Sequence, residues 1–581
     1  MSQPRRIFEG PAPRVYTLSP AADFLKSLAR TLVAEFPDPE VLAGVTVLLP
    51  TRRAGRALGE AFNAIQAESG IGAAILPLIR PVGDVDADEP PFEPGELDHL
   101  ALPAISAARR RFELASLILA REAAARREMM PDGALVLADA LASLLDELAS
   151  EEIEGLGDLA DPALREALPA DRQEAAIFLD IVLEQWPAHL KGLGLTDPAS
   201  RRSALLNALA RSWQEKPPPG PVIAAGSTGS IPAAAHLLTV IAGLEKGAVV
   251  LPGFAGFMDA PSWKAIDEGH PQRAMKALIE RIGIGPSDVR EWPLATIKVV
   301  SDTASSEPTE AMAQARARLI TESLRPADET ADWLKRIRVL DEPWGGNVVG
   351  LGIKGLSVIE APDPASEARA IALALRETLE TPGRTAMVVT PDRALARRIT
   401  TEMARFGVEL DDSAGEALSD TAPGAFLMRV MEVAGDPGSA LALAALWTSP
   451  LFALRDKRSA LMTDIAEMER KTLRGSRPGH SFADVIARVE KAGNARWLEI
   501  MRAIEAAFAP LMTLEGDQPP RVFAEALVAV AEGLSASDDL SGADRLWAGE
   551  AGESAAILIR EFLEEADALP PLSLRAFTRV L

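Results

Sequence analysis

The chain has 581 residues, a formal net charge of −24 and no cysteine. This length exceeds what one hydrophobic core supports, so we expect several domains. Without cysteine, the chain cannot form a disulfide framework, a thiolate zinc site or a cysteine-ligated iron–sulfur cluster. The acidic balance opposes indiscriminate binding to nucleic acid or acidic membranes, although it remains compatible with local basic grooves.

The five histidines show neither H-x-x-x-H nor H-E-x-x-H spacing, so the chain gives no support to a catalytic zinc helix. No apolar run approaches the roughly 18 residues of a membrane-spanning helix, and the basic N-terminus is not followed by a secretory apolar segment. We therefore predict a cytoplasmic protein with no cofactor or metal in this chain and no membrane partner.

Apolar runs and helical periodicities alternate over the first hundred residues, which is typical of an α/β domain. Ser19 followed by Pro20 predicts a capped helix that runs to about Glu35. The loop Gly83–Leu97, rich in acidic residues and proline, indicates a boundary. The other elements expected here are a strand at Arg14–Leu18, a strand–turn–helix unit at Val45–Ile65 and a strand within Ile71–Pro81.

The next hundred residues lack the alternation of a strand and predict amphipathic helices. The expected helices are Arg109–Glu128, Ala134–Glu154, Asp171–Leu190 and Ser200–Glu215. After a proline-rich linker, the α/β pattern returns with a strand at Val222–Ala225, a helix at Pro232–Leu244 and a strand at Ala248–Leu251. This order suggests a helical block inserted between two parts of one sheet.

A polar, irregular region at about 296–345 links the two halves of the chain. The second half opens with an expected strand at Leu356–Glu360, a helix at Glu367–Leu379 capped from Asp363, and further strands at Ala386–Val389 and Val408–Leu410. Beyond about Gly438 the sequence is helical. The helices expected there are Leu441–Trp447, Arg458–Arg470, Phe482–Lys491, Ala495–Phe508, Arg521–Gly533 and Ala543–Leu569. We expect the chain to stop inside a continuing helix.

One strand–turn–helix unit occurs twice, as Val45–Ile65 and as Thr385–Phe406. Pro50, Arg52 and Arg56 align without a gap with Pro391, Arg393 and Arg397. Two copies so far apart suggest two related α/β domains. The predicted boundaries are 1–105 and 217–300 for the two parts of the first α/β domain, 106–216 for the helical insertion, 301–345 for a linker, 346–437 for the second α/β domain and 438–581 for a helical domain.

A phosphate-binding loop would need G-x-x-x-x-G-K-[ST] between the first strand and the first helix. The chain has Pro20 to Ser27 at that place, with Lys26 and Ser27 where the motif has its last pair. Proline has no N–H, and Leu25 replaces a glycine that needs a positive φ. We interpret the stretch as a helix start, with a decayed nucleotide site as the alternative, and expect no ATPase activity in either case.

Arginines follow a predicted strand in both copies of the unit, as Arg52, Arg53 and Arg56 and as Arg393, Arg397 and Arg398. The carboxyl edge of an open α/β sheet is where ligands bind, and arginine there suits phosphates of a nucleotide or of DNA. The alternative is a solvated helix face with local salt bridges. The loop Gly226–Ser230 offers a possible anion nest, but an ordinary strand-to-helix turn is the better interpretation because a lysine and an acidic pair are missing.

Several segments resemble the AddB family, whose members are subunits of AddAB helicase–nucleases and share the layout of superfamily 1 helicases. They are Val45–Phe62, Ile75–Asp86, Pro221–Leu238, Ala248–Phe254, His270–Gly283 and Ile359–Gly415. In the helicase scheme, Val45–Phe62 matches motif Ia, which touches single-stranded DNA, and Ala386–Arg398 matches motif IV. The resemblance implies two RecA-like domains with large helical insertions.

The resemblance also implies a helicase-like subunit that guides or recognises single-stranded DNA during double-strand break repair, with an AddA-type subunit as the motor. It places the nuclease domain, with its magnesium site and iron–sulfur cluster, beyond Leu581. Lys26 and Ser27 would be a degenerate nucleotide site. The candidate DNA-binding residues are Thr51, Arg52, Arg53, Arg56, Arg80, Arg393 and Arg397.

Two alternatives stay open. The first is an active ATP-dependent DNA helicase, which requires phosphate binding between Pro20 and Ser27. The second is a helical interaction protein without a role on DNA. Measurement of DNA-stimulated ATP hydrolysis distinguishes the active helicase from the ATPase-inactive subunit. Measurement of salt-dependent DNA binding distinguishes a protein that acts on DNA from one that does not.

Overall fold

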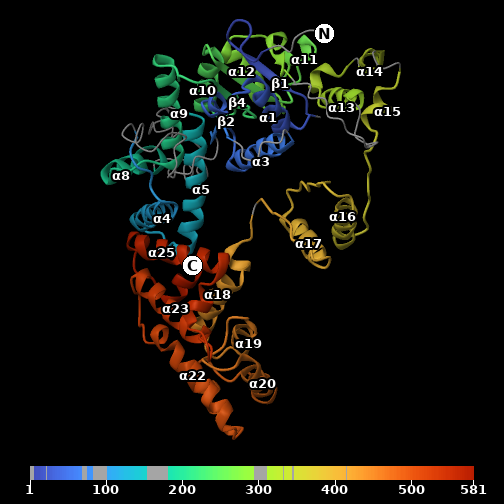
Figure 1. The fold of residues 1–581 in the computed structure, drawn as a ribbon. Coiled ribbons are helices and arrows are strands. Elements are labelled where there is room, and N and C mark those ends of the chain that lie inside the picture. Colours follow the sequence, from blue (N-terminus) through green and yellow to red (C-terminus); the bar gives the residue numbers. More distant parts are fainter. Residues whose placement is uncertain are drawn as a thin grey trace. The chain divides into compact units, whose positions relative to one another are not determined.

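The computed structural model describes residues 6–20, 22–68, 75–82, 101–153, 181–293, 310–331, 333–342, 346–413 and 415–581 (Figure 1). Two compact units are present. The first contains residues 1–105 and 143–356, and the second contains residues 106–142 and 357–581. Among the described residues, no helix combines the length and apolar character needed to cross a bilayer.

A six-stranded sheet organises the first unit, and every paired strand in it is parallel to its neighbours. The strand order is β3-β2-β4-β5-β1-β6. The strands are β1 (Val15–Leu18), β2 (Thr46–Leu49), β3 (Leu78–Pro81), β4 (Val222–Ala225), β5 (Gly247–Pro252) and β6 (Arg290–Glu291). With helices dominating the rest of the chain, the predicted helix-rich α/β class is confirmed.

Strands from distant parts of the sequence pair in this sheet. Val222 of β4 pairs with Thr46 of β2, and Val249 of β5 pairs with Val15 of β1. The strands before and after the helical stretch therefore share one sheet. Because they are parallel, the segments that follow β1, β2, β4 and β5 all emerge at one carboxyl edge.

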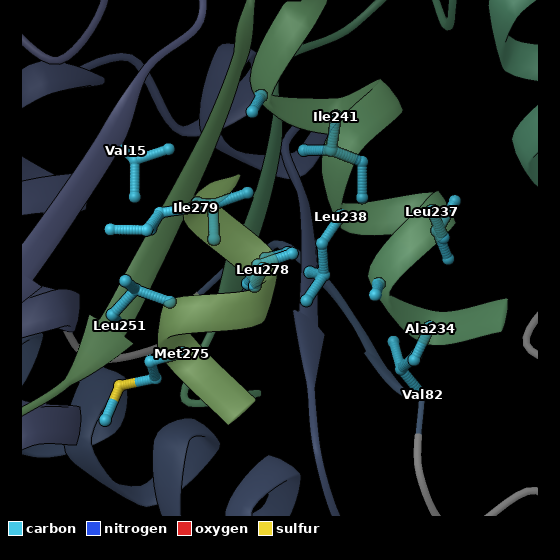
Figure 2. Packing of buried hydrophobic residues seen from close by; sticks show 14 of the residues in the cluster. Val15, Val82, Ala234, Leu237, Leu238, Ile241, Leu251, Met275, Leu278 and Ile279 are labelled. Carbon is cyan, nitrogen blue, oxygen red and sulfur yellow. The ribbon is translucent and has the colours of Figure 1, made fainter. Parts of the chain in front are cut away.

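Helices cover both faces of the sheet, and the strand side chains alternate between them. On one face, Val47 and Leu49 pack with α1 (Phe24–Glu35), α2 (Pro39–Ala43) and α3 (Arg52–Glu68). On the other face, Val15 and Leu251 pack with α9 (Pro198–Glu215), α10 (Pro232–Gly243) and α12 (Arg273–Ile282), as Figure 2 shows for α10 and α12. Phe62 of α3 is fully buried, and burial of such a side chain contributes about 3 kcal/mol.

The region expected to be an irregular linker contains helices. They are α13 (Glu310–Ser323), α14 (Trp333–Asp341) and, just beyond it, α15 (Val348–Gly352). The prediction of an irregular stretch is wrong for these residues. A signal was present in α13, whose sequence EAMAQARARLITES is rich in residues of high helix propensity.

The described part of the second unit is helical. It contains α4 (Ala107–Ala124) and the first part of α5 (Pro131–Ser150), together with α16 (Pro364–Leu379), α17 (Arg393–Ala404), α18 (Ala422–Gly435), α19 (Ala440–Thr448), α20 (Arg458–Met468), α21 (Phe482–Lys491), α22 (Ala495–Met512), α23 (Pro520–Ser535), α24 (Gly542–Leu546), α25 (Gly549–Glu565) and α26 (Leu574–Val580). Helix α18 was not predicted from the sequence. The single helix expected at Ala543–Leu569 is in fact α24 and α25.

Helix α4 packs against helices more than 400 positions later in the chain. The ring of Phe112 meets that of Phe562 edge to face at 5.3 Å, and Phe562 meets Phe577 in the same way at 5.7 Å. The Ser116 hydroxyl donates a hydrogen bond to the carbonyl of Ala568. Residues 106–142 therefore share a core with the C-terminal helices, an association that local sequence patterns do not reveal.

The three strands predicted in the second half are not formed. Residues 357–413, which the structure describes throughout, contain no β-strand. The side chains of Val358, Met387 and Val389 are more than four-fifths exposed. Helices α16 and α17 are present as expected and pack together through Ala368, Ala372, Ile399 and Met403.

Some predicted elements lie wholly or partly outside the described residues. They are the loop Gly83–Leu97, the first residues of the strand within Ile71–Pro81 and the first part of the helix Asp171–Leu190. The first helix is described, and it begins at Phe24 rather than at Pro20. Asp23 caps it, because its carboxylate accepts a hydrogen bond from the backbone N–H of Lys26 at 3.1 Å.

Candidate functional site

Apolar side chains pack against the turns that follow β4 and β5 at the carboxyl edge of the sheet. Gly253, which follows β5, has φ +64, and a Cβ built on it would lie 2.9 Å from Cγ of Pro20. Gly226, which follows β4, has φ +81, and its Cβ would lie 3.5 Å from both the ring of Phe24 and Cδ of Pro50. Both glycines occupy the left-handed region, where a side chain is disfavoured. The backbone turns after β4 and β5 are therefore packed directly against Pro20, Phe24 and Pro50.

The N-terminus of α1, at the same edge, is already capped by an acidic residue. The Asp23 carboxylate accepts from Lys26 N, and Ser27 N donates to the Asp23 carbonyl at 2.8 Å. A carboxylate at this position satisfies the amides that would otherwise bind an anion, and it repels phosphate. Lys26 and Ser27 thus lie in the first turn of α1, behind Asp23.

The first turn of α3 brings a threonine and three arginines to the carboxyl side of β2. Thr51 caps the helix by accepting a hydrogen bond from Ala54 N at 3.1 Å. Arg52, Arg53 and Arg56 are exposed, and Arg52 and Arg53 make further polar or charged contacts. The basic turn is therefore held by a side-chain cap and presents its guanidinium groups to solvent.

Arg80 lies at the same end of the sheet, but on its other face. It stands at the carboxyl end of β3, paired with Leu48 of β2, and its side chain is half-buried. Helix α3 packs on the same strand, because a Cβ on Gly55 would lie 3.4 Å from Ile79. Leu48 packs against the helices of the other face, so Arg80 and the arginines of α3 share one end of the sheet but lie on opposite faces.

The second copy of the unit reproduces the helix start of the first. Arg393 is the first residue of α17, as Arg52 is of α3, and Asp392 caps it as Thr51 caps α3. Two arginines of this copy pair with carboxylates. Arg393 donates two hydrogen bonds to Asp412, at 3.0 and 2.7 Å, and these bonds raise the pKa of its guanidinium above the ordinary value.

Arg397 forms a second ion pair in this copy, with Asp420 at 2.9 Å. Both pairs are solvent-exposed, and exposed pairs contribute little to stability. The arginines of the second copy are therefore partly neutralised by neighbouring carboxylates. This arrangement matches the local salt bridges that the sequence left open as an alternative.

The glycine-rich loop after β4 packs as a strand-to-helix turn. A Cβ on Gly229 would lie 3.2 Å from both terminal methyl groups of Leu278 in α12, and Gly229 N donates to the hydroxyl of Ser227 at 3.4 Å. The loop is thus pressed against the core of the sheet. The prediction of an ordinary turn agrees with this packing.

Sequence analysis missed a charged cluster around Asp259, the N-cap of α11 (Ala260–Lys264). Asp259 accepts hydrogen bonds from Ser262 N at 3.0 Å, from Arg325 at 2.6 Å and from Arg336 at 2.5 Å. Burial alone would raise the pKa of Asp259, but the hydrogen bonds from Ser262 and Arg325 outweigh burial and lower that pKa to about 2. The partners lie 66 and 77 positions away, so no local motif could reveal them.

Within the described ranges, no group of three or more histidine, aspartate or glutamate side chains is arranged to hold a metal ion. No protein-family model matches the chain. A search of curated proteins also found no match.

Proposed function

We propose that this chain is the helicase-like part of an AddB-type subunit in a complex that processes DNA double-strand breaks. In this proposal the sheet of the first unit forms a RecA-like domain with a helical insertion. The chain hydrolyses no ATP itself and guides single-stranded DNA across the first turn of α3. An AddA-type subunit supplies the motor. The observation that carries the proposal is the basic, exposed turn of α3 beside a carboxyl edge that Pro20 and Phe24 close.

The sheet topology supports the RecA-like assignment. The strand β1 lies inside the sheet, with β5 on one side and β6 on the other. The loop after β1 therefore emerges at an interior position of the carboxyl edge, where open α/β sheets bind ligands. That position carries Pro20 and Asp23 rather than glycines and free amides, which favours a subunit without ATPase activity.

Electrostatics supports a nucleic-acid ligand at α3. The chain carries −24 overall, yet Arg52, Arg53 and Arg56 are concentrated on one exposed helical turn, and Arg80 lies at the end of the adjacent strand. Guanidinium groups bind the phosphates of a nucleic-acid backbone through paired hydrogen bonds. Because the chain is acidic overall, a local basic site confines phosphate binding to that part of the surface.

The test is binding of a fluorescently labelled oligothymidylate, measured by anisotropy at several salt concentrations. We expect the double variant Arg53→Ala/Arg56→Ala to bind several-fold more weakly and to reduce the salt slope by about 0.7 for each lost contact. Arg502→Ala, which removes one exposed charge from α22, is the control and should bind as the wild type does. Equal binding by all three proteins would rule out a DNA path across α3.

A helical interaction protein without a DNA role is the second candidate, because Arg393 and Arg397 are engaged by Asp412 and Asp420. In the same assay, Arg393→Ala/Arg397→Ala should weaken binding less than the α3 double variant if α3 carries the strand. Wild-type binding that is weak and insensitive to salt would favour the second candidate instead.

A further inference from the structure

A cleft of about 400 Å³ lies in the first unit, away from α3. Its walls are Phe257 and α11 on one side and α13 and α14 on the other. Polar contacts join the walls: Asp259 forms ion pairs with Arg325 and Arg336, and His270 Nε2 lies 3.0 Å from the carbonyl of Leu324. The volume falls within the range of small-molecule sites.

The cleft has an excess of positive charge. Its lining contains Arg318, Arg325, Lys335 and Arg336, but only two carboxylates, Asp259 and Glu322. Arg325, whose side chain is 8% exposed, is bound by both carboxylates at 2.6 Å. The two carboxylates therefore form ion pairs with Arg325 and with one nitrogen of Arg336. The positive charges of Arg318 and Lys335 are not balanced by a carboxylate of the lining.

Three donors of the lining have capacity for a ligand. Nε of Arg336 is buried and has no hydrogen-bond partner. Within the described part of the chain, Lys335 is exposed and makes no hydrogen bond or ion pair, and Arg318 makes only a ring contact. A buried donor without a partner destabilises the structure. An oxyanion in the cleft would satisfy that donor and balance the two uncompensated charges.

An aromatic ring stands beside these cations. The guanidinium carbon of Arg318 lies 5.1 Å from the centroid of the Phe257 ring. The Phe257 side chain remains 43% exposed, although a large apolar side chain gains free energy from burial. A ligand that carries both a planar apolar group and an oxyanion would meet both features, because a nucleobase stacks favourably on an aromatic ring.

We infer that this cleft binds a nucleotide, with its phosphate held by Lys335, Arg318 and Nε of Arg336 and its base against Phe257. A free nucleotide and a nucleotide within single-stranded DNA share this chemistry. The site is separate from the proposed DNA path, because no residue of α3 lines it. Its failure would therefore leave the proposed function standing, and the reverse also holds.

The experiment titrates the full chain with thymidine monophosphate and with thymidine, which lacks the phosphate, by calorimetry. We expect millimolar or tighter binding of the monophosphate and at least about tenfold weaker binding of thymidine. Lys335→Glu should weaken the monophosphate by about tenfold or more, because it places a negative charge where the phosphate binds. Arg338→Glu, an exposed residue of α14 outside the cleft, makes a similar change of charge and should alter the affinity less than twofold.

A second arm identifies the source of the nucleotide through oligothymidylate binding. If Lys335→Glu weakens the monophosphate alone, the ligand is a free nucleotide; if it weakens both, nucleotides of the strand enter the cleft. Arg318→Ala repeats the test with a smaller side chain, and circular dichroism shows whether each variant is folded. Absence of millimolar monophosphate binding by the wild type, or equal losses in Lys335→Glu and Arg338→Glu, would overturn the inference.

Discussion

Pro20 packs against Gly253 where β1 and β5 end, so closely that a Cβ on the glycine would lie 2.9 Å from Cγ of the proline. Proline has no N–H to offer a ligand, and its ring covers the turn after β5. Asp23 then occupies the helix N-terminus at the same edge. One contact thus shows how an edge suited to ligand binding is closed by side chains.

Gly253→Ala should destabilise the first unit through two effects. The left-handed backbone, with φ +64, costs an alanine about 1 kcal/mol, and the contact with Pro20 adds about 1–3 kcal/mol because a proline ring cannot turn away. Gly283→Ala is the control, since Gly283 has φ +83 and no atom within 4 Å of the added Cβ. Urea unfolding of both variants measures the difference, and equal losses would show that Pro20 does not constrain Gly253.

Magnesium ATP should leave the melting temperature of Lys335→Glu, in which the inferred nucleotide cleft is impaired, unchanged, because Pro20, Phe24 and Asp23 lie at the edge where its phosphates would bind. A ligand at about 100 times its dissociation constant stabilises a protein by about 2.7 kcal/mol. Such a stabilisation would raise the melting temperature by several degrees. A rise of that size in differential scanning calorimetry would contradict the closed edge and favour the active helicase.

Asp259→Asn should lower stability at neutral pH, and its difference from the wild type should shrink as the pH falls. The carboxylate of Asp259 has its pKa lowered from 3.8 to about 2 in the folded chain, so its stabilisation is present above pH 4 and is lost as pH falls toward 2. Because its side chain is 36% exposed, solvent screening reduces the loss at pH 7 to about 1 kcal/mol.

Unfolding midpoints in urea at pH 7 and near pH 3 measure this change. Asp267→Asn, an exposed carboxylate in the segment that follows α11, serves as the control. A gap between Asp259→Asn and the wild type that stays constant with pH would show that the carboxylate charge is not what stabilises the cluster.

Helix boundaries could be predicted from the sequence where the residues that determine them lie within one segment. The boundaries of α21, Phe482–Lys491, follow from its apolar period and the N-cap Ser481. The start of α1 was placed too early because Ser19 and Pro20 resemble a helix start as well as Asp23 does. The two possible helix starts differ in how they pack at the carboxyl edge of the sheet. That packing depends on β5, which lies far away in the sequence.

In the candidate site too, features set by neighbouring residues were predictable, whereas contacts between distant residues were not. The arginines after β2 could be identified from the strand–turn–helix pattern, and Thr51 caps their helix through a neighbouring residue. The ion pairs of Arg393 with Asp412 and of Arg325 with Asp259 join residues that no short motif connects. Contacts between residues far apart in the sequence therefore determine which arginines form ion pairs.

The strand predicted in the second copy of the unit is not formed, for a related reason. An apolar run favours a strand, but a strand also needs neighbours for its backbone N–H and C=O groups. In the first copy, β2 pairs with β3 and β4, which lie elsewhere in the chain. Among residues 357–413 no such pairing is present.

The two copies allow a matched test of this difference, because Leu48 and Val389 occupy equivalent positions. Leu48 is 2% exposed in the core of the sheet, whereas Val389 is 82% exposed. Leu48→Ala should cost about 2–5 kcal/mol, since it leaves a cavity between β2 and the helices above it. Val389→Ala should change stability by no more than about 0.5 kcal/mol. Urea unfolding followed by circular dichroism measures both, and a large loss in Val389→Ala would mean that this segment is packed in solution as β2 is.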